Sequence, residues 1–150
     1  MLLTLHSLEE TKNFAHKLAK LLIQGDVIAL TGDLGSGKTT LAQYIIKYLC
    51  GEEAEVISPT FNLVQLYPAL KFTIWHFDLY RLKSAEEIIE LGLDEAVDSG
   101  VSIIEWPQIA ENLLPKEKLL INLACGTNNE RVVSLECSGK WGNIWKSEKN

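Results

Sequence analysis

The stretch Gly32-Asp33-Leu34-Gly35-Ser36-Gly37-Lys38-Thr39 decides the fold that this sequence predicts. It follows the phosphate-loop pattern, in which a glycine, four further residues, a second glycine and a lysine precede a serine or threonine. Its flanks also fit, because the apolar run from Val27 to Leu30 predicts a buried strand and the segment from Thr40 to Cys50 predicts a helix. A strand, a glycine-rich loop and a helix in this order are typical of P-loop proteins.

The residue types in this loop suit the binding of a polyphosphate. Glycines allow backbone conformations that other residues rarely adopt, so main-chain N–H groups can approach phosphate oxygens. The start of the helix adds further N–H donors and the positive end of the helix dipole. Lys38 can reach the β- and γ-phosphates, and the Thr39 hydroxyl can bind Mg²⁺. The predicted phosphate-binding residues are Gly32, Asp33, Leu34, Gly35, Ser36, Gly37, Lys38, Thr39 and Thr40.

Composition limits the class of protein. A chain of 150 residues is most simply one domain, spanning residues 1–150. Its 14 basic and 20 acidic residues give a net charge of −6, which argues against a broad basic face for nucleic acid, so any RNA should be carried by a partner. Three cysteines, Cys50, Cys125 and Cys137, without close pairing or metal-ligand spacing indicate buried thiols in a reducing compartment. With no signal peptide or membrane-spanning run, we expect a cytoplasmic protein without a membrane association.

Hydrophobic periodicity and turn residues predict an α/β fold. We expect a P-loop NTPase-like domain of three layers, with a mostly parallel central sheet, helices on both faces, and an antiparallel hairpin and edge. Ser7 with Glu10, and Ser84 with Glu87, have the spacing of capping boxes at helix starts. The expected helices cover residues 8–24, 40–50 and 84–91, and the expected strands cover residues 2–5, 27–30, 62–67, 71–80, 101–105, 119–124 and 132–137.

Polar residues at three places could complete a site. Alternation along residues 71–80 puts His76, Asp78 and Tyr80 on one strand face, where each is either a structural hydrogen-bonding group or part of a site. Thr60 lies in a Ser-Pro-Thr-Phe turn after the helix that follows the phosphate loop. It either senses Mg²⁺ and a γ-phosphate or belongs to a plain turn. Thr11 lies in the first turns of the first helix, where threonine is usually solvated.

Glu105 ends an apolar strand in the manner of a Walker-B acid. The run Val101-Ser102-Ile103-Ile104 would bury the strand centrally and place the carboxylate at its C-terminal edge, beside a bound Mg²⁺. Aspartate is commoner than glutamate at this position. Glu105 could bind Mg²⁺ directly, bind it through water, or polarise an attacking water, and a solvated strand end is the structural alternative.

Five motifs in order resemble one family over nearly the whole chain. They are GDLGSGKTT at 32–40, SPTF at 58–61, HFDLYR at 76–81, LGLDE at 91–95 and IEWP at 104–107. Together they are similar to the bacterial TsaE family, also called YjeE. The resemblance implies a small Mg²⁺-dependent ATPase, weakly active alone and stimulated by partners. It implies action with the TsaB and TsaD proteins to form the threonylcarbamoyl group on the adenosine beside the anticodon, position 37, in tRNAs that read ANN codons.

The resemblance also implies roles for individual residues. ATP phosphates would lie in the loop, with Mg²⁺ held by Thr39 and Glu105, and the catalytic residues would be Lys38, Asp78 and Glu105. Thr60 and Asp78 would lie near the γ-phosphate. By similarity, Thr11 and Arg131 would contact the nucleotide, and Trp106 matches a family tryptophan. The tail at residues 139–150, with Trp141 and Trp145, lies outside the family pattern, and it would either dock on the domain or meet a partner.

Two other functions compete with a partner-activated ATPase. A small-molecule kinase could use Asp78 as a base, but it needs several arginines over the transferred phosphoryl group, and this chain has only Arg81 and Arg131. A nucleotide-sensing module would bind without turnover. A guanine-specific switch protein is not favoured, because the sequence lacks an Asn-Lys-x-Asp motif.

Overall fold

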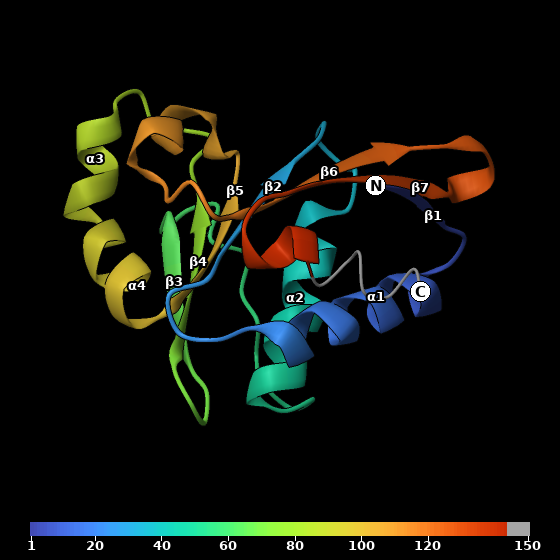
Figure 1. The fold of residues 1–150 in the computed structure, drawn as a ribbon, viewed down its shortest axis with the longest axis horizontal. Helices are drawn as coiled ribbons and strands as arrows, with labels where there is room; N and C mark the ends of the chain where they lie inside the picture. The colour runs from blue at the N-terminus through green and yellow to red at the C-terminus, as the bar shows by residue number, and fades with distance from the viewer. Residues whose placement is uncertain (144–150) are drawn as a thin grey trace.

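The computed structural model describes residues 1–143, which form a single seven-stranded sheet with helices packed against it (Figure 1). The strand order is β1-β7-β6-β2-β5-β4-β3. The elements are β1 (Leu2–Leu5), α1 (Leu8–Leu21), β2 (Val27–Thr31), α2 (Lys38–Cys50), β3 (Val64–Pro68), β4 (Thr73–Asp78), α3 (Ala85–Glu90), α4 (Leu93–Ser99), β5 (Val101–Glu105), η1 (Pro107–Leu113), β6 (Leu119–Cys125), η2 (Thr127–Asn129) and β7 (Arg131–Cys137), where η marks a 3-10 helix.

Parallel strands form the centre of the sheet and antiparallel strands form its edges. Strands β6, β2, β5 and β4 run parallel to one another. Strand β3 pairs antiparallel with β4 as the expected hairpin, and β7 and β1 extend the opposite edge in antiparallel fashion. The predicted α/β class, with a mostly parallel centre and an antiparallel hairpin and edge, is therefore confirmed.

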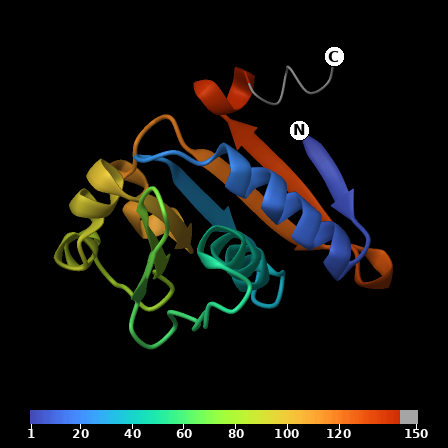
Figure 2. The ribbon, with the colours of Figure 1, turned by 90° about the horizontal axis from the view of Figure 1, so that it is seen from below.

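Helices cover both faces because successive residues of a strand point to opposite sides. In β2, Ile28 and Leu30 join the larger core cluster, which packs under α1 and α2, whereas Val27 joins the cluster under α3, α4 and η1. Figure 2 shows α1 and α2 lying across one face of the sheet. The same alternation in β4 turns Ile74 toward α1 and α2 and Phe77 toward the other helices. His76 and Asp78, which share the face of Ile74, therefore lie on the α2 side.

Two expected elements end earlier than their sequence patterns predict. Helix α1 ends at Leu21 rather than at residue 24, because Leu22 is extended with ψ of 132°. Strand β4 ends at Asp78 rather than Tyr80, since an Asp78 carboxylate oxygen accepts the Tyr80 amide at 3.1 Å and so closes a turn. Helices α4 and η1 were not expected from the sequence. Each has 7 residues, too few for a clear helical repeat of apolar positions.

The two predicted capping boxes differ in outcome. Ser7 accepts the Glu10 amide at 3.1 Å, but the Glu10 carboxylate accepts the His6 amide rather than that of Ser7, so half of the first box forms. The second box is wrong. Ser84 makes no side-chain cap hydrogen bond, and the Glu87 carboxylate instead reaches one residue further back to the preceding amide.

The segment that follows β7 packs onto the domain. Trp141 is fully buried in the larger core cluster. The preceding Lys140 forms an ion pair with Asp26, whose side chain lies at the turn before β2. Trp141 thus docks on the core, whereas Trp145 lies outside the described residues.

Cys50, Cys125 and Cys137 are free thiols, but the expectation that all three are buried is wrong, because Cys125 is exposed and the other two are half-buried. Partial burial raises the pKa of Cys50 and Cys137. Among the helices of residues 1–143, none has the length and apolar character needed to cross a membrane.

Candidate functional site

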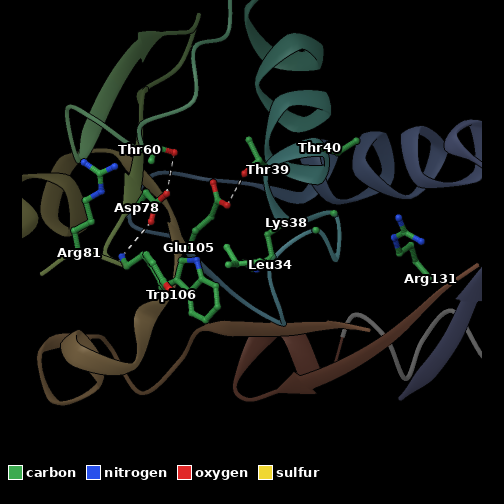
Figure 3. A pocket seen from close by; sticks show the side chains of 13 residues that line it. Leu34, Lys38, Thr39, Thr40, Thr60, Asp78, Arg81, Glu105, Trp106 and Arg131 are labelled. Atoms are coloured by element: carbon green, nitrogen blue, oxygen red, sulfur yellow. Dashed lines mark hydrogen bonds between the residues drawn. The ribbon is translucent and has the colours of Figure 1, made fainter. Parts of the chain in front are cut away.

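A cavity of about 400 Å³ opens at the carboxyl ends of β2, β4 and β5, and we call it the phosphate-loop cavity (Figure 3). Parallel strands bring their carboxyl ends to one edge of a sheet, where ligands of α/β proteins commonly bind. The residues that line the cavity are Leu34, Gly35, Gly37, Lys38, Thr39, Thr40, Thr60, Asp78, Tyr80, Arg81, Glu105, Trp106 and Arg131.

The backbone of the loop requires glycine at two positions. Gly32 has φ of +139°, and a Cβ there would collide with the Leu123 carbonyl oxygen in β6. Gly37 has φ of +106° and precedes α2, which has no side-chain cap at its start. The loop therefore comes close to β6, and the amides of the first helical turn keep no side-chain acceptor.

Lys38 extends across the loop from the start of α2. Its Nζ donates to the carbonyl oxygens of Gly32 and Asp33, at 2.6 Å and 2.9 Å, and lies 4.3 Å from the centroid of the Trp106 ring. Burial lowers the pKa of Lys38, and the negative charges of Glu105, Asp78 and Asp33 partly offset that effect. A buried cation thus lies at the centre of the loop.

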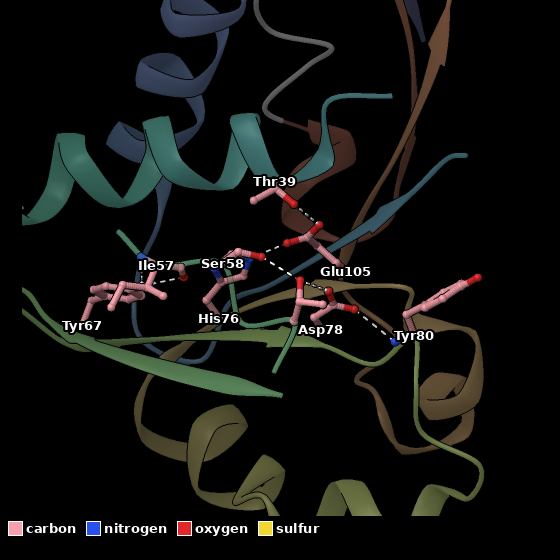
Figure 4. A network of polar contacts seen from close by, with 9 residues as sticks. Thr39, Ile57, Ser58, Tyr67, His76, Asp78, Tyr80 and Glu105 are labelled. Carbon is pink, nitrogen blue, oxygen red and sulfur yellow. Dashed lines mark hydrogen bonds and ion pairs between the residues drawn. The ribbon is translucent and has the colours of Figure 1, made fainter. Parts of the chain in front are cut away.

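Glu105 is held from two sides at the end of β5. Its Oε1 accepts the Thr39 hydroxyl at 2.7 Å, and its Oε2 lies 2.7 Å from His76 Nε2 (Figure 4). Glu105 is 2% exposed, so the structural alternative of a solvated strand end is wrong. The sequence-predicted pair Thr39 and Glu105 is in direct contact.

Asp78 and Thr60 meet on the other side of Glu105. The Thr60 hydroxyl lies 3.4 Å from Asp78 Oδ2 and 2.8 Å from the Ser58 hydroxyl. The other Asp78 oxygen accepts the Tyr80 amide. In the parallel register of β4 and β5, Asp78 is directly opposite Glu105, which explains why two distant motifs supply neighbouring carboxylates.

A second cavity, of about 300 Å³, adjoins the first, and we call it the Thr11 cavity. Gly37, Thr40 and Arg131 line both cavities. Thr11 is 7% exposed and its hydroxyl donates to the Ser7 carbonyl oxygen at 3.2 Å, so the alternative that it is a solvated helix residue is wrong. The complete lining is Leu5, His6, Ser7, Leu8, Thr11, Ser36, Gly37, Thr40, Leu123, Asn129 and Arg131.

The structure thus gathers the sequence-predicted site residues around two connected spaces. Gly32 and Asp33 line neither cavity, and their contribution is the pair of carbonyl oxygens that Lys38 contacts.

Three residues that line the phosphate-loop cavity, Tyr80, Arg81 and Trp106, were not predicted as site residues. Trp106 has a left-handed backbone, with φ of 56°, and its ring lies 4.9 Å from that of Tyr80. The Arg81 guanidinium lies 5.1 Å from the Phe61 ring. The alternation along residues 71–80 grouped Tyr80 with Asp78 but did not assign it to the site, and in the structure Tyr80 lies in the turn just past the end of β4. The left-handed turn at Trp106 has no sequence signal.

The residues around the loop fit a nucleotide phosphate and Mg²⁺. Ser36 Oγ is buried without a hydrogen-bond partner within the part of the chain that the structure describes, so the loop holds an unsatisfied polar group. The same part contains no cluster of three or more His, Cys, Asp or Glu side chains suited to a metal. Mg²⁺ commonly uses one or two protein carboxylates and completes its shell with phosphates and water. Thr39 and Glu105 are a donor set of that kind.

Comparison with known proteins agrees with this geometry. Residues 5–133 match the family model "Threonylcarbamoyl adenosine biosynthesis protein TsaE". The protein named "tRNA threonylcarbamoyladenosine biosynthesis protein TsaE" in Rickettsia conorii is 52% identical over 88% of this chain and 75% of its own length. The protein of the same name in Bacillus subtilis is 37% identical over 87% of this chain and 82% of its own length.

A solved structure supports the same relationship. The crystal structure of Bacillus subtilis YdiB superposes with a TM-score of 0.80 and 28% identity, covering 98% of this chain and 92% of the other. The matched span, residues 5–133, covers the residues that line both cavities. The chain therefore belongs to the TsaE family of threonylcarbamoyl adenosine biosynthesis proteins.

Proposed function

We propose that this protein binds ATP with Mg²⁺ and hydrolyses it. The observation that carries the proposal is the 2.7 Å contact between Thr39 Oγ1 and Glu105 Oε1, directly beside the glycine loop. These two oxygens would hold Mg²⁺, and the bound ion would neutralise charge on the phosphates and orient them. The loop amides and Lys38 would hold the phosphate chain itself.

Lys38 and Asp78 would act on the reacting end of the nucleotide. The Lys38 ammonium lies near the loop carbonyls and can exchange those two acceptors for phosphate oxygens, which carry more negative charge. Asp78, with Thr60 beside it, would orient and polarise the attacking water, because its carboxylate lines the cavity next to Glu105. Glu105 would either share that task or serve the metal alone.

The Thr11 cavity would receive the nucleoside. It adjoins the phosphate-loop cavity through Gly37, Thr40 and Arg131, so a ligand whose phosphates lie in the loop can extend into it without a break. Thr11 and Arg131 would supply polar contacts to the sugar and base. This placement accounts for two residues that lie far from the loop in sequence.

The hydrolysis would serve the formation of the threonylcarbamoyl group on adenosine 37 of tRNAs that read ANN codons. The names of the relatives and the family model support this process. We infer that TsaB and TsaD are the partners, that they stimulate the ATPase, and that tRNA is contacted through them in the cytoplasm. The net charge of −6 supports indirect contact, since a protein that holds tRNA directly usually presents a basic face.

ATP turnover with and without TsaB and TsaD tests this function. We expect slow phosphate release from the protein alone and faster release with both partners. Formation of threonylcarbamoyladenosine in tRNA should require all components and ATP. A turnover that the two partners leave unchanged would contradict the proposal.

A small-molecule kinase is the second candidate, because Asp78 and Arg81 both line the phosphate-loop cavity, where an acceptor hydroxyl could bind beside the nucleotide. A metabolite screen with labelled ATP separates the two functions. Labelled inorganic phosphate without a phosphorylated metabolite supports the hydrolase, whereas transfer to one metabolite supports the kinase.

A further inference from the structure

We propose that His76 is a positioning residue that fixes the rotation of the Glu105 carboxylate, so that Oε1 is presented to the metal while Oε2 stays bound to the imidazole. The inference rests on the proposed function, because it assigns a metal to Glu105. It adds a residue that touches neither the nucleotide cavity nor the ion. His76 is absent from the lining of both cavities.

The contact between the two side chains is direct and fully enclosed. His76 is 0% exposed and Glu105 is 2% exposed, and His76 Nε2 lies 2.7 Å from Glu105 Oε2. An ionised carboxylate offers only acceptors, so Nε2 carries the hydrogen and donates it. Low exposure strengthens such a charge-assisted bond, since water does not compete for either group.

Histidine is a poor choice for filling this space alone. Its other ring nitrogen, Nδ1, is buried without a hydrogen-bond partner among residues 1–143, so Glu105 is the one group there that accounts for the imidazole. A buried polar atom without a partner is costly, and an apolar side chain would avoid that cost. The neighbouring inward position on the same strand face, Ile74, is apolar and fully buried. We therefore assign His76 to Glu105 rather than to packing.

The two oxygens of Glu105 are held by different elements. Oε1 accepts from Thr39 at the start of α2, and Oε2 accepts from His76 in β4. In the register of β4 and β5, Asp78 is opposite Glu105, so His76 lies two residues earlier on the same face, and the two side chains meet across that offset. When a metal takes the Thr39 hydroxyl and Oε1, only that first contact has to change. The second contact keeps the carboxylate from rotating.

This arrangement also suits a glutamate in place of the commoner aspartate. A glutamate side chain has one more rotatable bond than an aspartate, so it reaches further but is less well oriented by its backbone. A hydrogen bond from a neighbouring strand removes that freedom. Partners behind a metal ligand typically change metal affinity by about 10- to 100-fold when they are lost.

The test is Mn²⁺ binding, measured from the spin-resonance signal of free Mn²⁺ in the presence of a non-hydrolysable ATP analogue. His76→Leu removes the donor, and His76→Gln places an amide N–H near the position of Nε2. We expect His76→Leu to weaken Mn²⁺ binding by about 10-fold or more, and His76→Gln to recover most of the loss. The affinity of both variants for a fluorescent ATP analogue, measured in EDTA, should stay within about twofold of the wild-type value, because the phosphate loop is not altered.

Phe77→Leu is the matched control, since Phe77 is fully buried in the same strand but points to the opposite face. It should lower thermal stability and leave Mn²⁺ affinity unchanged. The assignment would be overturned if folded His76→Leu bound Mn²⁺ as tightly as the wild type. It would also be overturned if His76→Leu and Phe77→Leu lost the same amount of Mn²⁺ affinity. If His76→Leu does not fold, His76→Asn replaces it, because its shorter amide cannot reach Glu105. Equal affinity in His76→Asn and His76→Gln would then overturn the assignment.

Failure of the proposed function gives a different result. If the wild-type protein binds neither the nucleotide analogue nor Mn²⁺ in its presence, the ATPase proposal is wrong, and the role of His76 that depends on it is wrong as well. If the wild type binds both and the His76 variants bind equally well, only the positioning role is wrong.

Discussion

Lys38 has two carbonyl partners within its own loop, and this bears on what its replacement should do. Lys38→Ala removes a cation that we expect to exchange those carbonyls for phosphate oxygens. Hydrogen bonds to charged groups contribute about 1.5–3 kcal/mol, so affinity for ATP should fall by about 10- to 100-fold. Titration with a fluorescent ATP analogue measures this. Lys71→Ala, at an exposed lysine, is the control, and equal affinity of the two variants would contradict the role of Lys38.

Glu105→Ala should affect turnover more than nucleotide affinity. The carboxylate contacts Thr39 and lies beside the loop, but it is not part of the backbone that would hold the phosphates. A bound metal supplies several kcal/mol to the transition state, so partner-stimulated turnover should fall by at least about 100-fold. Nucleotide affinity measured in EDTA should change little. Glu86→Ala, at an exposed acid of α3, should behave as wild type, and similar turnover of the two variants would exclude Glu105 from the chemistry.

At the level of elements, the loop between β2 and α2 is the most constrained segment. Gly32→Ala should strain the backbone at φ of +139° and push a Cβ against β6. We expect a cost of about 3 kcal/mol or more, or a fall in Tm of roughly 6 to 12 °C. Gly35→Ala is the matched control, because its φ is also positive but its added Cβ would meet no atom within 4 Å. If thermal melts show the same fall in Tm for Gly32→Ala and Gly35→Ala, close packing of the loop on β6 is not important for stability.

The elements also show what the sequence could and could not predict. The loop, β2, β5 and α2 have strong local signals, so Lys38, Thr39 and Glu105 were assigned from their own neighbourhoods. The Thr11 cavity depends instead on strand order, because β1 and β7 pair side by side and bring α1 and Arg131 to the loop. Hydrophobic periodicity in the sequence does not specify the order of strands in a sheet. Only the family resemblance suggested that Thr11 contacts the nucleotide. The short helices α4 and η1 were missed because two turns give too little pattern.

Across the whole molecule, the segment after β7 contributes to the core although the family match ends at residue 133. Trp141→Ala should leave a cavity in the cluster that packs under α1 and α2. Loss of a buried tryptophan costs about 3–5 kcal/mol, which corresponds to a fall in Tm of roughly 6 to 20 °C. Leu70→Ala is the control, because Leu70 is 101% exposed. An unchanged melting curve for Trp141→Ala would mean that the segment is dispensable for stability.

The contact between Thr39 and Glu105 has a consequence for the order in which ligands assemble. A divalent ion that binds without a nucleotide would have to break this hydrogen bond and would gain only one anionic oxygen and one hydroxyl oxygen, which offset little of the cost of losing its water ligands. With a nucleotide in place, the same ion also gains phosphate charge. We therefore expect the divalent ion and the nucleotide to bind cooperatively, so that each binds tightly only when the other is also bound.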